Sequence, residues 1–256
     1  MPSDTVLYEV KDRIAHITLN RPEVMNSLSR ELLARYREIL SEFEDNPEPL
    51  VAIVRGAGDK AFSSGMDLKE RASKDKTEGP QRKSRPTPPI QEVWKPMIAA
   101  INGYCVAGGL EIALQCDIRI ATPKSQFGLP EPRWSLTAGP GLHHLNRMIP
   151  LGEALYIQLT GERINAERAY QIGLIQKLVP EDKLGEEAEK VARSVLMCAP
   201  LAIRAIKKTV MIGRNLPVEY SWRYANEMAS TLNRTEDALE GPRAFAEKRK
   251  PNWKGK

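Results

Sequence analysis

The sequence is poor in the residues and patterns on which many enzyme sites depend. It contains three histidines and three cysteines in 256 residues, with no CxxC pair. His143 and His144 are adjacent, so on a helix they would point in different directions, and His16 lies in an expected strand. The fingerprints GxGxxG, GxxxxGK[ST], GxSxG and HExxH are all absent. These absences argue against a zinc framework, a histidine-based triad, a phosphate-binding loop and a dinucleotide-binding turn.

Long apolar runs and a strong charge are missing as well. No apolar run approaches the ~20 residues that a membrane span needs, and the opening MPSDTVLYEVKDR has no apolar signal core. The cysteines fall in apolar segments, as small buried residues do in a reducing compartment. The net charge of +5 fits an anionic ligand such as a phosphorylated cofactor, and also weak nucleic-acid binding. We therefore expect a cytoplasmic protein without a membrane partner.

Hydrophobic periodicity predicts an α/β protein. Residues 6–19 alternate as a hairpin does, and SRELLARYREILSEFEDN places its apolar side chains on one helical face with Ser29 as N-cap. Short apolar runs rich in β-branched residues predict buried strands over 50–56, 97–103 and 117–122. A helix is expected between the last two strands. Strand, helix and strand in that order favour a parallel βαβ unit.

The second half of the chain has a different character. Polar residues with Pro and Gly fill 72–90, which indicates an active-site loop or lid inside one domain. After residue 150 the pattern is helical, so we expect a core domain over 1–190 and a helical region over 191–256. The expected helices are 151–159, 166–172, 181–198, 201–212, 217–232 and 236–248.

Three loop motifs remain as carriers of chemistry. In KAFSSGMD, Gly65 either makes an ordinary strand-to-helix turn or projects the Met66 amide into a site. In AGGLE, the glycines either let a helix pack closely or present the Gly108 amide, at a helix N-terminus, to a developing negative charge. In QFGLPEPRW, Glu131 is either solvated or a catalytic carboxylate. Together the motifs supply two amides for an oxyanion hole and two glutamates for acid–base chemistry, which suits a reaction through a thioester enolate.

Five segments resemble enoyl-CoA hydratases of the crotonase family. They are KAFSSGMDLKE, KPMIAAINGYCVAGGLEIALQCDIRIAT, SQFGLPE, LTGERINAERAYQIGLIQKLV and EDALEGPRAFAEKRKPNWKG. The segments follow the family's order and cover nearly the whole chain. The resemblance implies repeated ββα turns that form a superhelical core, followed by a C-terminal helical region that trimerises, with two trimers often stacking as a hexamer.

The resemblance also implies a reaction and its residues. The amides of Met66 and Gly108 match the oxyanion hole that holds the thioester oxygen, and Glu111 and Glu131 match the two glutamates of hydratases. The reaction is the addition of water across the 2,3 double bond of an enoyl-CoA, with no metal or redox cofactor, since coenzyme A is part of the substrate. Glu111 lies in the first turn of a helix, where the dipole favours its charged form, so we expect it to be the base. Glu131 is then the proton donor, and the pair shares a water.

Contacts with coenzyme A are expected on the loop after Gly65 and on the C-terminal tail. The loop matches the family's pantetheine and adenine contacts, and the charge of Lys69 suits a phosphate. The tail positions reach coenzyme A in the family, sometimes from an adjacent subunit, but a capping amphipathic helix explains them equally well. The residues expected to bind substrate are Ser64, Gly65, Asp67, Leu68, Lys69, Gly109, Trp134, Phe245 and Lys248.

The segment PRWSLTAGPGLHH departs from the common hydratase pattern. Arg133 and Trp134 are bulky, Pro140 stiffens the turn, and the second glycine of a Gly-Gly pair is missing. The tail is similar to that of crotonobetainyl-CoA hydratase, so a polar or branched short-chain substrate is an alternative. Isomerisation, thioester hydrolysis and carnitine-type dehydration are further alternatives within the family. RNA binding is permitted by the charge and by QRKSR at 81–85, but no aromatic-interleaved basic stripe supports it.

Overall fold

The structure is a computed structural model that describes residues 4–67 and 93–256. The loop expected over 72–90 lies outside the described residues, and so do Leu68 and Lys69. Within the described part, no helix combines the length and the apolar character that a membrane crossing requires.

The N-terminal hairpin and the first helix are confirmed. Strands β1 (Val6–Lys11) and β2 (Ile14–Leu19) pair antiparallel across a turn in which Asp12 and Arg13 have φ of 51° and 65°. After the short turn η1 (Pro22–Val24), helix α1 (Arg30–Asp45) begins at Ser29, whose hydroxyl accepts a hydrogen bond from the Leu32 amide at 3.1 Å. The apolar face of α1 is buried, as its periodicity predicted.

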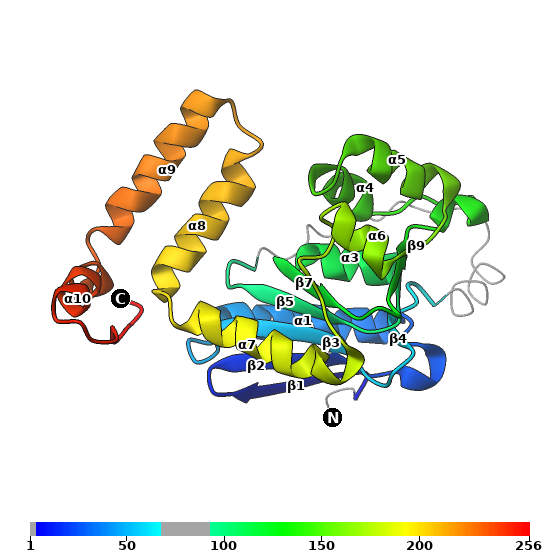
Figure 1. The fold of residues 1–256 in the computed structure, drawn as a ribbon, viewed down its shortest axis with the longest axis horizontal. Coiled ribbons are helices and arrows are strands. Elements are labelled where there is room, and N and C mark those ends of the chain that lie inside the picture. The colour runs from blue at the N-terminus through cyan, green and yellow to red at the C-terminus, as the bar shows by residue number, and fades with distance from the viewer. Residues whose placement is uncertain (1–3, 68–92) are drawn as a thin grey trace.

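The larger sheet has six strands in the order β1-β2-β3-β5-β7-β10, and all of them except β1 run parallel. The added strands are β3 (Val51–Gly56), β5 (Met97–Ile101), β7 (Ile118–Ala121) and β10 (Lys177–Leu178). Side chains alternate between the faces: Val51 and Ile53 pack towards α7 (Leu184–Leu196), whereas Ala52 and Val54 join the main core with α1. Both faces are covered, which explains the continuous apolar strands (Figure 1).

A second, four-stranded sheet supplies the repeat. Its order is β4-β6-β8-β9, formed by β4 (Ala61–Ser63), β6 (Tyr104–Val106), β8 (Gln126–Gly128) and β9 (Ile164–Asn165). Strands β3, β5 and β7 lie in the first sheet, and the next strand along the chain, β4, β6 or β8, lies in the second. This repeated ββ step is the superhelical ββα core that the resemblance implied. The short strands of the second sheet were not predicted, because two or three residues carry no readable alternation.

The remaining helices surround the sheets. All six helices expected after residue 150 are present, and the boundary predicted at residue 190 falls inside α7. The helical elements are α3 (Gly108–Gln115), η2 (Glu131–Trp134), α4 (Gly141–His144), η3 (Leu145–Arg147), α5 (Leu151–Thr160), α6 (Ala166–Gln171), η4 (Glu181–Lys183), α8 (Pro200–Gly213), α9 (Val218–Leu232) and α10 (Glu236–Ala246).

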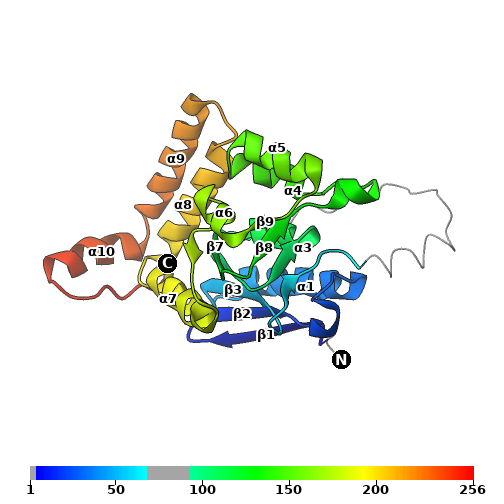
Figure 2. The same cartoon turned by 45° about the vertical axis from the view of Figure 1, so that its right-hand side comes forward.

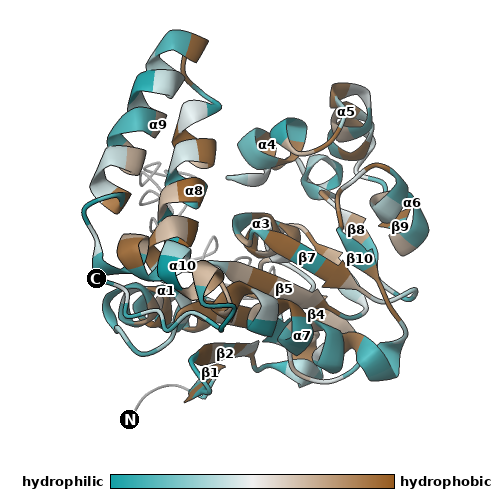
Figure 3. Ribbon diagram, turned by 60° about the vertical axis from the view of Figure 1, so that its left-hand side comes forward, coloured by the Kyte–Doolittle hydropathy of each residue, from teal (hydrophilic) through white to brown (hydrophobic). Residues whose placement is uncertain are grey.

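Helices α8 and α9 form a hairpin that projects from the core, with α10 beyond it (Figures 1 and 2). Helix α9 buries none of its residues within the chain, and Trp222 is 67% exposed. Figure 3 shows the contrast with the larger sheet, whose strands are mostly hydrophobic, while α9 is a patchwork of both kinds. One cysteine prediction was wrong: Cys105 and Cys116 are buried, but Cys198 is exposed because it follows the last turn of α7.

Candidate active site

The two glycines that open α3 do different things. A side-chain carbon added at Gly109 would lie 2.4 Å from the carbonyl oxygen of Ser63, so only glycine lets α3 rest on β4. At Gly108 the nearest atom to an added carbon is Cδ1 of Leu28 at 2.9 Å, which is the movable end of a side chain. Close packing therefore explains Gly109, which was expected to contact substrate, and explains less of Gly108.

The backbone at the start of α3 leaves the Gly108 amide without a protein acceptor among the described residues. Ala107 is the N-cap and offers no side-chain oxygen, unlike the usual Ser, Thr, Asp or Asn. The first hydrogen bond of the helix runs from the Glu111 amide to the Ala107 carbonyl at 3.1 Å. The Gly108 amide comes before the first hydrogen bond of the helix and lies at the positive end of the helix dipole.

The Met66 amide is in a similar position on a neighbouring loop. The amides of Ser64, Gly65 and Asp67 donate to the Met25 carbonyl, the Ser63 hydroxyl and the Leu28 carbonyl at 3.0, 3.2 and 3.2 Å. In the described part of the chain, no acceptor is found for the amide of Met66 between them.

The two loops touch each other. A side-chain carbon at Gly65, where φ is +87°, would lie 3.2 Å from the Gly108 nitrogen, and one at Gly108 would lie 3.8 Å from the Met66 nitrogen. The structure thus brings together the two amides that were expected to hold an oxyanion, each unpartnered within the part of the chain described here. Their role in catalysis stays a prediction.

The Glu111 carboxylate is held by the segment from Gly139 to Gly141. Its Oε1 accepts a hydrogen bond from the Gly141 amide at 3.0 Å, across the contact between α3 and α4. Gly139 also lies against this carboxylate, since a side-chain carbon there would be 3.4 Å from Oε1. At the far end of α3, the buried Arg119 side chain donates to the carbonyls of Cys116 and Leu174 at 2.6 and 2.7 Å. The base expected at Glu111 is therefore mounted on a fixed helix.

Glu131 opens the 3-10 turn η2 and is held less firmly. Its Oε2 atom is buried and has no hydrogen-bond partner within the described residues. Burial raises the pKa of the Glu131 carboxyl, the negative charge of Glu111 raises it further, and a backbone hydrogen bond partly opposes both. Two nearby carboxylates in unlike surroundings, one accepting an amide from α4 and one with a buried oxygen that has no partner among the described residues, are what a base and an acid need if they act on the same substrate.

Sequence reasoning missed the residues that hold the Glu111 carboxylate. Gly139 and Gly141 flank Pro140. This segment was interpreted by the bulk of its side chains, whereas its glycines contact the Glu111 carboxylate. The available signal was the pair of glycines two residues apart, which indicates close approach of the backbone to another group.

Other predicted contact residues have partners of their own or face solvent. The carboxylate of Asp67 forms an ion pair with Arg21 at 3.2 Å, with both side chains mostly buried, so Asp67 anchors its loop. The Ser64 amide donates a hydrogen bond to the Met25 carbonyl. Trp134, in η2, is 65% exposed and open to a ligand.

The two tail residues lie elsewhere in the chain. Phe245 is 88% exposed on α10, and Lys248 follows that helix. Helix α10 lies at the edge of the molecule, beyond the α8–α9 hairpin and away from the central helix α3 (Figures 1 and 2). Within one chain, the structure does not bring Phe245 and Lys248 to the glutamates.

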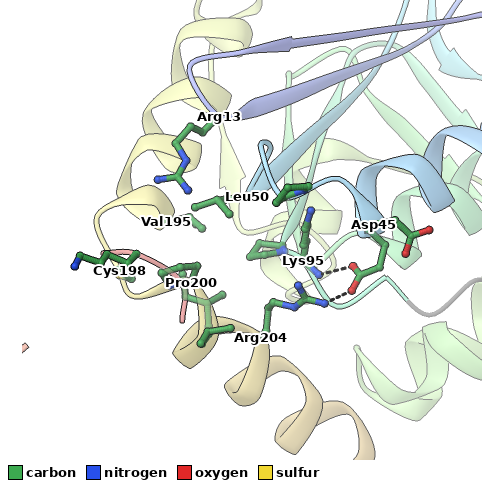
Figure 4. A pocket seen from close by; sticks show the side chains of 15 residues that line it. Arg13, Asp45, Leu50, Lys95, Val195, Cys198, Pro200 and Arg204 are labelled. Carbon is green, nitrogen blue, oxygen red and sulfur yellow. Dashed lines mark hydrogen bonds and ion pairs between the residues drawn. The ribbon is translucent and has the colours of Figure 1, made fainter. Parts of the chain in front are cut away.

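The cavities of the described residues that reach α8 do not include either glutamate. One of about 220 Å³ lies where the start of α8 meets the end of α1 (Figure 4). There Glu44 pairs with Arg204 and accepts the Trp94 amide at 3.0 Å, while the Lys95 ammonium donates to the Phe43 carbonyl at 2.6 Å. A second cavity of about 790 Å³ is mostly apolar and lies between α8 and the core. The ion pair between Glu44 and Arg204 fastens α8 to the core.

No three acidic, histidine or cysteine side chains within residues 4–67 and 93–256 are grouped so that they could hold one metal ion.

Comparison with known proteins agrees with the fold. The family model described as enoyl-CoA hydratase/isomerase matches residues 9–256. The (E)-benzylidenesuccinyl-CoA hydratase of Thauera aromatica is 40% identical over 253 residues, covering 98% of this chain and 99% of that protein. The carnitinyl-CoA dehydratase of Citrobacter koseri is 36% identical over 251 residues, covering 95% of each.

A crystal structure of an enoyl-CoA hydratase/isomerase from Mycobacterium paratuberculosis superimposes with a TM-score of 0.89 at 37% identity, covering 99% of both chains. The family model covers almost the whole sequence, and the relatives are aligned over nearly their full length. The chain therefore belongs to the enoyl-CoA hydratase/isomerase family and has the crotonase fold.

Proposed function

We propose that this protein is an enoyl-CoA hydratase, a hydro-lyase that adds water reversibly across the 2,3 double bond of a trans-2-enoyl-CoA. The observation that supports it most is that the two carboxylates have unlike surroundings. Glu111 accepts a hydrogen bond from the Gly141 amide, whereas Glu131 has a buried oxygen without a partner in the described residues. The adjacent amides of Met66 and Gly108 add donors for a thioester oxygen.

The proposed reaction gives each group one role in the addition of water. The Glu111 carboxylate takes a proton from water, and the resulting hydroxide oxygen forms a bond to C3 while the π electrons move towards the thioester. The Met66 and Gly108 amides stabilise the enolate oxygen by hydrogen bonding, and Glu131 in its acid form gives its proton to C2. The raised pKa of Glu131 favours the acid form that this step needs. Transfer of the proton from Glu111 to Glu131 through a shared water restores both groups.

A bulky or polar acyl group is a second candidate for the substrate. The Thauera relative is named for benzylidenesuccinyl-CoA and the Citrobacter relative for carnitinyl-CoA, and neither name describes a simple straight chain. In this chain, the exposed Trp134 stands three residues after Glu131 and offers an aromatic surface to such a group.

The assembly and setting belong to the proposal as well. We expect a homotrimer or a dimer of trimers, supported by the exposed apolar side chains of α8 and α9, among them Ile206, Val210 and Trp222. A neighbouring subunit would then be able to bring Phe245 and Lys248 to coenzyme A. We expect a cytoplasmic enzyme that uses coenzyme A only as part of its substrate, with no metal or redox cofactor and no nucleic-acid partner.

A panel of acyl-CoA substrates tests the proposal. The panel contains crotonyl-CoA, a longer 2-enoyl-CoA, crotonobetainyl-CoA, benzylidenesuccinyl-CoA and a 3-enoyl-CoA. Hydration removes the conjugated thioester absorbance, whereas isomerisation of the 3-enoyl-CoA creates it. We expect loss of absorbance with at least one 2-enoyl-CoA. Free thiol release without hydration, isomerisation alone, or salt-sensitive RNA binding with no turnover would each replace the hydratase assignment.

A further inference from the structure

One methyl group, the Cβ of Ala107, lies against Gly65 where the loops that carry the Met66 and Gly108 amides meet. We propose that Ala107 is a positioning residue, whose Cβ acts as a spacer that fixes the Gly108 amide relative to the Met66 amide. This inference rests on the proposed function, because it concerns the same two amides.

The backbone of Ala107 is strained. Its φ of 50° and ψ of −131° lie in a region that glycine occupies readily and that a side chain disfavours. Two glycines follow directly in the sequence, yet a residue with a Cβ stands at this position. Ala107 also gives the helix no capping oxygen. Local helix chemistry would favour another residue here, so the methyl group needs a reason outside the helix.

The methyl group has a contact on the other loop. A side-chain carbon at Gly65 would lie 2.5 Å from the Cβ of Ala107, so this Cβ fills the space that a side chain at Gly65 would take. Gly65 itself has a φ of +87°. Each oxyanion amide thus follows a residue with positive φ, and these two residues are in contact.

The opposite side of the Met66 loop is already fixed. The Leu28 amide donates to the Gly65 carbonyl at 2.8 Å, and the Leu28 carbonyl accepts the Asp67 amide. With the loop held there, its approach to α3 is limited by the Cβ of Ala107. Removing that carbon frees Ala107 to relax and lets the loops close, so the direction of the Gly108 amide is no longer defined.

The variant Ala107→Gly tests this role, with Ala113→Gly as its matched control. Ala113 is buried nearer the C-terminal end of the same helix, so its replacement loosens α3 without removing the spacer. We expect Ala113→Gly to lower Tm while kcat changes less than about twofold, and Ala107→Gly to keep Tm while kcat falls about tenfold with little change in KM. That loss is smaller than the about 10²–10³-fold effect of deleting one oxyanion donor, because the amide is misdirected instead of lost.

A spectroscopic measurement separates positioning from general damage. Hydrogen bonds to the thioester oxygen polarise a bound, conjugated dienoyl-CoA and move its absorbance to longer wavelength. We expect this red shift to shrink in Ala107→Gly and to persist in Ala113→Gly. If Ala107→Gly keeps both the wild-type kcat and the full red shift, the spacer role is overturned while the hydratase assignment stands. If wild-type protein hydrates no enoyl-CoA, it is the proposed function that fails.

Discussion

The two segments that carry the glutamates are built differently. Helix α3 is closely packed: Gly108, Gly109 and Leu110 are buried, and Glu111 accepts a hydrogen bond from α4. The turn η2 has no buried residue, ends at Ser135 with a φ of 54°, and exposes Trp134. One carboxylate is fixed by the fold, and the other projects from a turn whose surroundings are partly open.

If the two glutamates act as proposed, the difference shows how one fold can separate a base from an acid. A hydrogen-bond donor and a helix N-terminus stabilise an anion, so the packed side suits proton abstraction. A buried oxygen without a donor favours the neutral acid, so the open side suits proton donation. The exposed Trp134 lies on this open side as well.

The largest expected effect comes from removing each carboxylate. Glu111→Gln and Glu131→Gln should each lower kcat about 10²–10⁴-fold while acyl-CoA still binds, because each loses one proton-transfer group. Steady-state hydration and binding of a saturated acyl-CoA measure the two quantities. Glu181→Gln, at a surface ion pair with Lys124, is the control and should keep normal turnover. Near-normal turnover in either active-site variant would contradict the two-glutamate mechanism.

A smaller effect is expected from substitutions that test how closely α3 and the surroundings of η2 are packed. Gly109→Ala on α3 should lower the free energy of unfolding by about 3 kcal/mol, because its new carbon meets the Ser63 carbonyl at 2.4 Å. Gly161→Ala beside η2 should cost about 1 kcal/mol, since its φ of +62° is a left-handed conformation and its nearest neighbour at 3.1 Å is the flexible Arg133 side chain. Urea unfolding of both variants checks this order, and equal losses would show that the two sides are packed alike.

The smallest effect concerns stability and pH. Because the pKa of Glu131 is raised in the folded state, the native protein binds more protons than the unfolded chain between the ordinary pKa of 4.5 and the raised value. Stability from this group is therefore lost as pH rises through that window. Glu131→Gln should be more stable than wild type at pH 7, because it removes a carboxylate whose charged form is disfavoured by burial and by the charge of Glu111.

Thermal unfolding at pH 4 and pH 7 measures this difference. We expect the stability gain of Glu131→Gln at pH 7 to disappear at pH 4, where the wild-type carboxyl is protonated. Glu181→Gln is again the control and should show no such change. A gain of equal size at both pH values would show that the cause is packing, not the charge of Glu131.

Much of the fold could be predicted because its signals are local. The hairpin turn, the Ser29 cap and the apolar face of α1 depend on residues within a few positions of one another, as do the helices after residue 150. The prediction that the loops of Met66 and Gly108 meet came from the motifs and the family resemblance, since no local pattern joins positions 42 residues apart.

What the sequence determined by itself was the longer strands and helices, the family resemblance and the two candidate glutamates. Tertiary structure decided what those residues meet: that Gly109 is required by the Ser63 carbonyl, that Gly141 holds Glu111, and that Ala107 lies against Gly65. It also placed α10 far from α3 within one chain. Contacts of this kind depend on how two sheets bring distant loops together, and a backbone approach of a few ångströms leaves no trace in periodicity or composition.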